Sequence, residues 1–441
     1  MRYLPKSPSE RQQMLAAIGA KSMDELFSFI PPAYRLKQPL ELPGPYSEAE
    51  VIEYFRARAD ENAVGYTNFI GAGVYNHLRS VVTDSMIQRG EFLTSYTPYQ
   101  AEISQGTLQA IFEFQTLMCQ LTGQEVANAS MYDGSTAMTE AVLMAGRLTG
   151  RQRVVVVRSV HPEYRQVLAT YARNAGINLV ELGFAQTGQA DLEALRAAVD
   201  ADTSALVVQS PNFFGVLEQV EQLAGIARAK GALLIVTITE AVSLGAVRPP
   251  AEADIVAMEG QSLGLPPSYG GPFVGVIATQ ERFVRQMPGR LAGQTTDANG
   301  RRGFVLTLAT REQHIRREKA TSNITTNQTL LALAGLFTLA WLGPQGLREV
   351  GETCLALAGY AKERIGLPLA FDRPTFKELA LRLPRPARDV VAEARARGVH
   401  PGYALGRDYP GMDDVLLVAL TEKRTPADVD RLAEVLREVC G

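Results

Sequence analysis

Val154-Val-Val-Val-Arg158 opens the stretch that decides the fold. Its four adjacent β-branched residues predict a buried strand, and a helical pattern from Pro162 to Asn174 follows it. Three more apolar runs repeat this alternation at Ile177–Leu182, Ala205–Gln209 and Leu233–Ile238. Near-continuous Val, Ile and Leu strands that alternate with helices are typical of a parallel sheet covered on both faces. We therefore predict an α/β fold built on a large, parallel-type sheet sandwiched by helices.

Helices between these strands and two later strands complete the alternation. Further helices are predicted at 191–199, with Asp191 as the N-cap, and near 218–230. Asp254–Met258 and Phe273–Ala278 add two predicted strands. A long helical region then runs from Asn327 to about Ile365 and is interrupted at Gly343-Pro344.

The two ends of the chain differ from this central pattern. The last part predicts a small α/β unit with strands at 376–383 and 415–420 and a closing helix at 426–439. Residues 1–60 hold short helical patterns separated by prolines, which is typical of an arm laid over another surface, such as that of a second subunit. We expect an N-terminal helical arm at 1–60, a large α/β domain at 61–330 and a small C-terminal α/β domain at 331–441.

The composition excludes several classes of protein. The 441 residues carry a formal net charge of −3, which gives no electrostatic reason to expect nucleic acid or an anionic membrane as a partner. The three cysteines are far apart, and the N-terminus lacks the apolar core of a signal peptide. The most apolar run, Leu330 to Leu342, is too short to span about 30 Å of hydrocarbon. We expect a cytoplasmic protein.

Short motifs add little. Gly71-Ala-Gly73 lacks the third glycine of a dinucleotide-binding loop and predicts a tight turn instead. No two histidines are paired at helical i, i+4 spacing, so no metal site is predicted. The four histidines are His77, His161, His314 and His400.

Four longer stretches are more informative. They are Ser95-Tyr-Thr-Pro-Tyr-Gln100, continued through Glu102-Ile-Ser-Gln-Gly106; Tyr132-Asp-Gly-Ser-Thr-Ala-Met-Thr-Glu-Ala141; Gln261-Ser-Leu-Gly-Leu-Pro-Pro-Ser-Tyr-Gly-Gly-Pro272; and Thr310-Arg-Glu-Gln-His-Ile-Arg-Arg-Glu-Lys-Ala-Thr-Ser-Asn-Ile324. Together they resemble fold-type I pyridoxal phosphate (PLP) enzymes and, more narrowly, the P-protein of the glycine cleavage system, glycine dehydrogenase (decarboxylating). The resemblance covers nearly the whole chain and is weakest before residue 60. In some bacteria this enzyme is split into two chains, and the sequence is similar to subunit 1, the alpha chain.

The resemblance also reveals two departures. A PLP enzyme needs a lysine for the Schiff base and an acidic partner for the pyridine nitrogen. Where the catalytic chain has its lysine this sequence has Gln261, and no lysine occurs between Lys230 and Lys319. The acidic partner should lie at the end of the strand that here runs from Leu234 to Thr239. The nearest acid is Glu240, one residue beyond the end of that strand. The resemblance therefore implies that the chain has no catalytic lysine of its own and that its cofactor pocket is vestigial.

The vestigial pocket is expected around Gly134, Ser135, Thr136 and His161. N–H groups and hydroxyls at a helix start suit a phosphate, and the alternative is simple N-capping by Ser135 or Thr136. His161 lies where such enzymes often place a ring over the cofactor. The alternative for His161 is capping of the helix that begins at Pro162.

Fold-type I sites take residues from both chains of a dimer. The resemblance thus implies that this chain completes the site of a lysine-bearing beta chain. Two stretches are expected to contribute: residues 96–100, and residues 321–323, which follow a predicted charged helix at 311–319. The alternative for the first stretch is a Pro-anchored turn packed inside this subunit. The alternative for the second stretch is a helix cap. The expected interface residues are Tyr96, Thr97, Tyr99, Gln100, Thr321, Ser322 and Asn323.

The implied reaction decarboxylates glycine and passes its aminomethyl group to the lipoyl arm of the H-protein. PLP is held by the partner beta subunit, an alpha2beta2 heterotetramer is expected, and this chain contributes geometry rather than a nucleophile. Two alternatives stay open. One is a self-sufficient PLP enzyme with an unusual lysine, for which Lys319 is the nearest candidate. The other is a structural or regulatory pseudo-enzyme with no part in a shared site.

Overall fold

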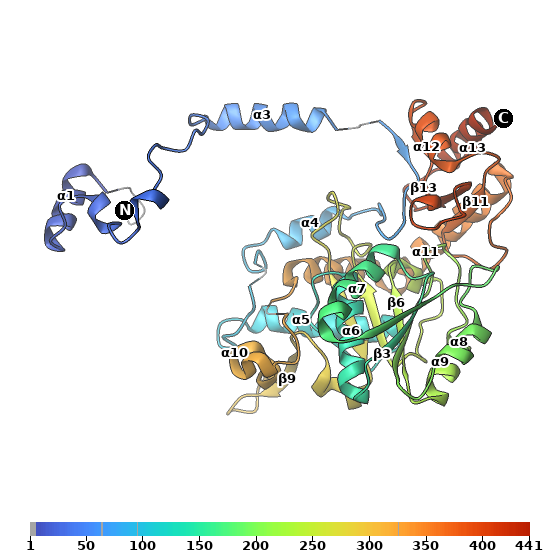
Figure 1. The fold of residues 1–441 in the computed structure, drawn as a ribbon, viewed down its shortest axis with the longest axis horizontal. Coiled ribbons are helices and arrows are strands. Elements are labelled where there is room, and N and C mark those ends of the chain that lie inside the picture. The colour runs from blue at the N-terminus through green and yellow to red at the C-terminus, as the bar shows by residue number, and fades with distance from the viewer. Residues whose placement is uncertain (1–5, 63–64, 95, 325) are drawn as a thin grey trace. The chain divides into compact units, whose positions relative to one another are not determined.

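The computed structural model describes residues 6–62, 65–94, 96–324 and 326–441. The chain divides into two compact units, residues 1–64 and residues 65–441 (Figure 1). Ser95, which begins one of the informative stretches, lies outside the described residues.

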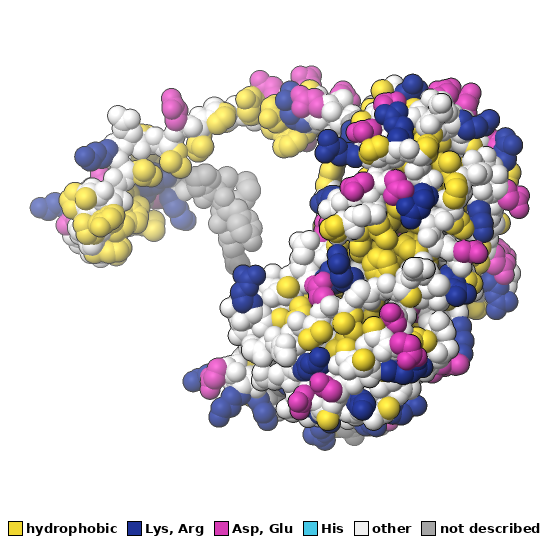
Figure 2. Space-filling view, turned by 45° about the vertical axis from the view of Figure 1, so that its right-hand side comes forward, with side chains coloured by type: hydrophobic (Ala, Val, Ile, Leu, Met, Phe, Trp, Pro, Cys, Tyr) yellow, Lys and Arg dark blue, Asp and Glu magenta, His cyan; other side chains and the backbone are white. Residues whose placement is uncertain are grey.

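The first unit is a series of short helices: α1 (Pro8–Ala17), α2 (Met23–Leu26), η1 (Pro32–Tyr34) and α3 (Glu48–Asp60). Capping boxes begin the two longer ones, α1 and α3. No described side chain of this unit is buried within it, and hydrophobic side chains gather over it in Figure 2. The unit therefore has no core of its own, and its apolar side chains need another surface to cover them.

A seven-stranded sheet of order β2-β8-β7-β6-β5-β3-β4 forms the centre of the second unit. The five strands from β4 to β7 in this order are parallel, as the sequence predicts, whereas β8 runs antiparallel to both of its neighbours, β7 and β2. The strands are β2 (Val126–Ala127), β3 (Arg153–Val157), β4 (Asn178–Leu182), β5 (Thr203–Gln209), β6 (Leu233–Ile238), β7 (Ile255–Glu259) and β8 (Gly275–Thr279).

Helices cover both faces of this sheet, because successive residues of a strand point to opposite sides. Val155 and Val157 of β3 lie in one core with α5 (Gln105–Thr122), α8 (Leu192–Ala198), α9 (Val220–Ala229) and α11 (Thr329–Ile365). Val154 and Val156 lie in the other with α6 (Gly134–Thr149) and α7 (Pro162–Ala175) (Figure 1). The predicted α/β sandwich is confirmed.

The C-terminal part builds a smaller antiparallel sheet of order β11-β14-β13. Its strands are β11 (Glu378–Arg382), β13 (Tyr403–Ala404) and β14 (Val415–Ala419), and it shares a core with α12 (Ala387–Arg395), α13 (Pro426–Cys440) and the end of α11. The chain enters this part just after the first unit, where β1 (Thr67–Asn68) pairs in parallel with β12 (Val399–His400). The segment after β1 therefore starts at the small sheet.

Helix α11 is the one helix, among the described residues, that is long and apolar enough to cross a membrane. Its residues contribute to the core of the large sheet and to that of the small sheet, and 44% of its most apolar window is buried. Gly343, with φ 62 and ψ −180, divides it at the predicted interruption before Pro344. These contacts assign α11 to the protein core.

One predicted element is wrong. The charged stretch expected to be a single helix at 311–319 consists of η4 (Ala309–Arg311), α10 (Gln313–Arg316) and η5 (Arg317–Lys319). Arg317 has φ 53, which a right-handed helix cannot include. The remaining elements are α4 (Val81–Ile87), η2 (Ala241–Gly245), η3 (Glu281–Gln286), β9 (Ala292–Thr296), β10 (Arg302–Leu306) and η6 (Leu405–Arg407).

Candidate functional site

Most of the predicted pocket residues follow the carboxyl ends of parallel strands of the large sheet. His161 follows β3, Glu240 follows β6 and Gln261 follows β7, while Gly134 begins α6. In an open α/β sheet the carboxyl ends of the parallel strands are where ligands bind. Here the segment from Gly71 to His77 lies at these strand ends and contacts His161, Glu240 and Gln261.

At the start of α6, the acidic side chains of Glu259 and Asp133 occupy the donors that would suit a phosphate. The N–H of Gly134 donates to Glu259 Oε2 at 2.8 Å. Asp133, not Ser135 or Thr136, is the N-cap: its Oδ1 accepts from the N–H of Thr136 at 2.8 Å and from the hydroxyl of Ser135 at 2.7 Å. Burial raises the pKa of Glu259 to about 8. The anion site expected here is satisfied by this chain's own side chains.

The imidazole of His161 is packed against the chain itself. Its Nδ1 accepts from the N–H of Glu163 at 3.2 Å, so His161 caps α7, and its Nε2 lies 2.9 Å from the carbonyl oxygen of Ala72. Burial lowers the pKa of His161, which favours the neutral ring that both contacts require. A Cβ added to Gly73 would lie 2.6 Å from the ring. There is no room for a methyl group there, and hence none for a stacked cofactor ring.

Gln261 holds the backbone of Tyr75 in place of reacting with a cofactor. Its Oε1 accepts from the N–H of Tyr75 at 2.9 Å, and its Nε2 donates to the carbonyl of Tyr75 at 2.9 Å and to that of Leu265 at 2.7 Å. A lysine here would supply no acceptor for the Tyr75 N–H. The side chain at the Schiff-base position is therefore a structural one.

Glu240 is paired with a buried cation from the C-terminal part. Lys377, only 1% exposed, forms an ion pair with Glu240 Oε2, and His77 Nε2 lies 3.0 Å from the same oxygen. Burial opposes ionisation of Glu240, but the Lys377 ammonium and the His77 imidazole outweigh it and hold the pKa of Glu240 below its usual range. The acid predicted nearest to a pyridine nitrogen already has its positive partner.

Glu378 makes two further contacts with the segment from Gly71 to His77. Glu378 of β11 accepts from the N–H of Ala72 at 2.8 Å and from the hydroxyl of Tyr75 at 2.8 Å. A Cβ on Gly71 would lie 2.5 Å from that of Ala419. Backbone and side chains of residues 71–77 thus fill the predicted pocket, and the residues of this site do not fit PLP.

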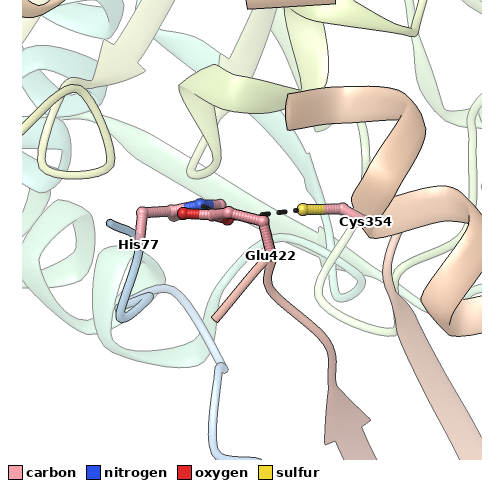
Figure 3. Close-up of side chains that lie close together, drawn as sticks. All are labelled: His77, Cys354 and Glu422. Atoms are coloured by element: carbon pink, nitrogen blue, oxygen red, sulfur yellow. Dashed lines mark hydrogen bonds and ion pairs between the residues drawn. The ribbon is translucent and has the colours of Figure 1, made fainter. Parts of the chain in front are cut away.

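His77, Cys354 and Glu422 form a compact group beside this pocket (Figure 3). His77 Nδ1 lies 2.6 Å from Glu422 Oε2, and the Cys354 sulfur lies 3.7 Å from that oxygen. Burial raises the pKa of the Cys354 thiol to about 12, and the ammonium of Lys377 lies 2.6 Å from His77 Nε2. A protonated thiol next to a fixed cation is a poor metal ligand set. We assign the group to internal charge pairing.

The residues predicted to reach a partner lie in a second place, on the surface. Tyr96 is 77% exposed and Tyr99 is 50% exposed, Gln100 and Asn323 are exposed, and Thr97 is buried. The remaining two, Thr321 and Ser322, are partly buried.

The structure brings the two predicted stretches together. The rings of Tyr99 and His314 meet edge to face with centroids 5.9 Å apart. Asn323 accepts from the side chain of Gln313 at 2.9 Å. Sequence reasoning missed Arg290, which contacts the hydroxyl of Tyr99 and the carboxylate of Glu312. It also missed Tyr75 and Lys377, because such partners are far apart in the chain and leave no local pattern.

Comparisons with known proteins agree with this fold. The model of the glycine cleavage system P-protein family matches residues 1–436. The chain is 53% identical over 439 residues to the probable glycine dehydrogenase (decarboxylating) subunit 1 of Koribacter versatilis (strain Ellin345), covering 98% of this chain and 99% of that one. The protein of the same name from Bacillus subtilis (strain 168) is 46% identical over 442 residues, covering 99% and 98%.

Solved structures point the same way. The crystal structure of glycine decarboxylase (P-protein) of the glycine cleavage system, in inhibitor-bound form, is 44% identical with a TM-score of 0.91 and full coverage of both chains. The sphingosine-1-phosphate lyase Bpss2021 of Burkholderia pseudomallei K96243 is 18% identical with a TM-score of 0.67 and 92% coverage of each chain, a likeness of fold alone. The chain belongs to the glycine cleavage system P-protein family.

Proposed function

We propose that this chain is the subunit of glycine dehydrogenase (decarboxylating) that holds no PLP and that it completes the site of a lysine-bearing second subunit. Its family and its relatives make it a subunit of the enzyme that acts on glycine. The observation that carries the proposal is the filled pocket: Gln261 binds the backbone of Tyr75, and Lys377 neutralises Glu240. The large domain keeps the enzyme fold but has no space for the cofactor.

The division of labour follows from this. PLP held by the partner would supply the electron withdrawal that allows glycine to lose carbon dioxide. The aminomethyl group then passes to the lipoyl arm of the H-protein. This chain supplies orientation and helps to exclude water from the shared site.

The surface around Tyr96 and Tyr99 is the part that we propose to face the partner's site. Both rings are exposed in this chain. Tyrosine is a large amphipathic residue that is enriched at interfaces, so exposed tyrosines here suit a surface that a partner covers. Gln100, Thr321, Ser322 and Asn323 supply amide and hydroxyl groups beside them. Between the two tyrosines, Thr97 is buried and its carbonyl accepts from the N–H of Tyr99 at 2.9 Å.

The N-terminal unit supports an obligatory partner. Phe29 and Tyr34 are exposed, as are the apolar side chains of α3. Such a segment is stabilised only when a partner covers it. We propose that residues 1–60 pack on a second subunit in a cytoplasmic alpha2beta2 assembly. Deletion of residues 1–60 is expected to weaken association with the beta chain, measured by light scattering of the mixture.

Substitutions at the proposed surface test the shared site. Tyr96→Phe, Tyr99→Phe and Asn323→Ala chains are mixed with the lysine-bearing subunit, and glycine-dependent carbon dioxide release is measured with excess PLP. We expect losses of about tenfold or more. Tyr360→Phe is the matched control, because its hydroxyl bonds Asp430 on the small domain. Unchanged activity in all three variants would leave only a structural role for this chain.

A self-sufficient enzyme with an unusual lysine is not favoured. Lys319 is exposed, and Lys377, the lysine buried beside the pocket, is engaged by Glu240 and His77.

A further inference from the structure

We propose that Arg290 is a positioning residue of the two-chain enzyme, which sets the orientation of Tyr99 and of the 312–323 segment before the partner binds. The inference rests on the proposed role of these residues in the partner's site. It adds a residue that acts through Tyr99 and Glu312.

Arg290 is buried at the point where three segments meet. It is only 5% exposed, and its backbone is fixed because its carbonyl accepts from the N–H of Ala129 at 2.9 Å. One terminal nitrogen donates to the hydroxyl of Tyr99 at 2.5 Å, and the other lies 2.5 Å from Glu312 Oε2. The guanidinium carbon is 5.2 Å from the centroid of the Tyr99 ring. One planar group thus holds two partners at once.

The neighbouring arginine extends this arrangement to the second predicted stretch. Arg311 is buried and donates to the carbonyls of Leu308 at 3.2 Å and Gly289 at 3.1 Å. Its own carbonyl accepts from the N–H of Thr321 at 3.0 Å. The start of the 312–323 segment is fixed by the Glu312 ion pair, and its end is fixed by this backbone bond.

A buried guanidinium is costly unless its donors are satisfied, so its presence here needs an explanation. We infer that Arg290 is buried here because it holds Tyr99. The side chain of Tyr99 is half exposed, while its hydroxyl accepts from Arg290 inside the protein. A ring held in this way loses little conformational entropy on binding. Lysine could keep the charge but not the planar fork that reaches both partners.

A double-mutant cycle in the assembled enzyme tests the inference. Arg290→Met, Tyr99→Phe and the double variant are each mixed with the lysine-bearing subunit at saturating PLP, and kcat and KM for glycine are measured. We expect each single variant to lower kcat by about 10- to 100-fold with a smaller change in KM. The double variant should lose much less than the product of the two single losses, because part of the effect of Arg290 passes through Tyr99.

Two further variants keep the result interpretable if Arg290→Met does not fold. Arg290→Lys retains the charge beside Glu312 and should give an intermediate kcat, and the same cycle is run with it. Arg302→Met is the control, since this exposed arginine lies over the ring of Phe304 at 5.5 Å on the adjacent hairpin. It should leave kcat unchanged.

The outcomes separate the two claims. If Tyr99→Phe lowers kcat but the Arg290 variants do not, or if the two effects multiply, Arg290 is not a positioning residue. If Tyr99→Phe and Asn323→Ala both leave kcat unchanged, the proposed shared site itself is wrong.

Discussion

Replacement of Lys377 by methionine would expose how strongly the filled pocket depends on its internal charge pair. The ammonium lies against Glu240, 2.6 Å from His77 Nε2 and 4.0 Å from the centroid of the Tyr75 ring. Methionine approximates the volume of the side chain but leaves the carboxylate of Glu240 without the ammonium of Lys377, with only the His77 imidazole beside it. Removing one partner of a buried ion pair costs about 3–5 kcal/mol of unfolding free energy. The Lys377→Met chain should lose that amount.

The assay is urea denaturation of the full chain, followed by far-ultraviolet circular dichroism. The double variant Lys377→Met/Glu240→Gln removes the uncompensated charge and should recover at least about 1 kcal/mol relative to Lys377→Met. Lys362→Met, at an exposed position of α11, is the control and should change stability by less than about 0.5 kcal/mol. A Lys377→Met chain as stable as this control would refute the pairing as an account of the pocket.

Three further changes probe the same region. Burial raises the pKa of Glu378 to about 7, above its unfolded value of about 4.5, so its contribution to stability is full below about pH 4.5 and is lost as the pH rises through 7. Glu378→Gln should therefore flatten the fall of the unfolding free energy between pH 5 and 7, measured by urea denaturation at each pH, which has a slope of up to about 1.4 kcal/mol per pH unit. Gly73→Ala forces a Cβ into the His161 ring at φ +95 and should cost about 2 kcal/mol or more by urea denaturation, whereas Gly359→Ala, with open space around it, should not. Gln261→Lys alone should not attach PLP covalently, because residues 71–77 still fill the pocket; a mass increase after borohydride treatment would contradict this.

Much of the fold follows from local sequence pattern. The β-branched runs gave the five parallel strands, and the Gly343-Pro344 pair marks the break in α11. The direction of β8 could not be predicted, since a short apolar run has the same pattern in either orientation. The left-handed backbone of Arg317 was equally hidden, because no glycine or asparagine signals it.

The candidate site was predictable only in part. The resemblance to the family, with Gln261 where the catalytic chain has lysine, implied a vestigial pocket, and Gly71-Ala-Gly73 predicted a turn. What fills the pocket depends on contacts between residues that are distant in the chain, such as Lys377 with Glu240. The domain boundaries at 60 and 330 and the contributions of Tyr96 and Tyr99 to a partner stay predictions.

The most direct test of the central claim is an absorbance spectrum from about 300 to 500 nm, with PLP added, of this chain alone and then of its mixture with the lysine-bearing subunit. The account predicts that the chain alone gives only the spectrum of free PLP, and that the mixture gains the band of lysine-bound PLP together with glycine-dependent activity. A band of lysine-bound PLP from this chain alone would contradict the filled pocket and, with it, the division of labour between the two subunits.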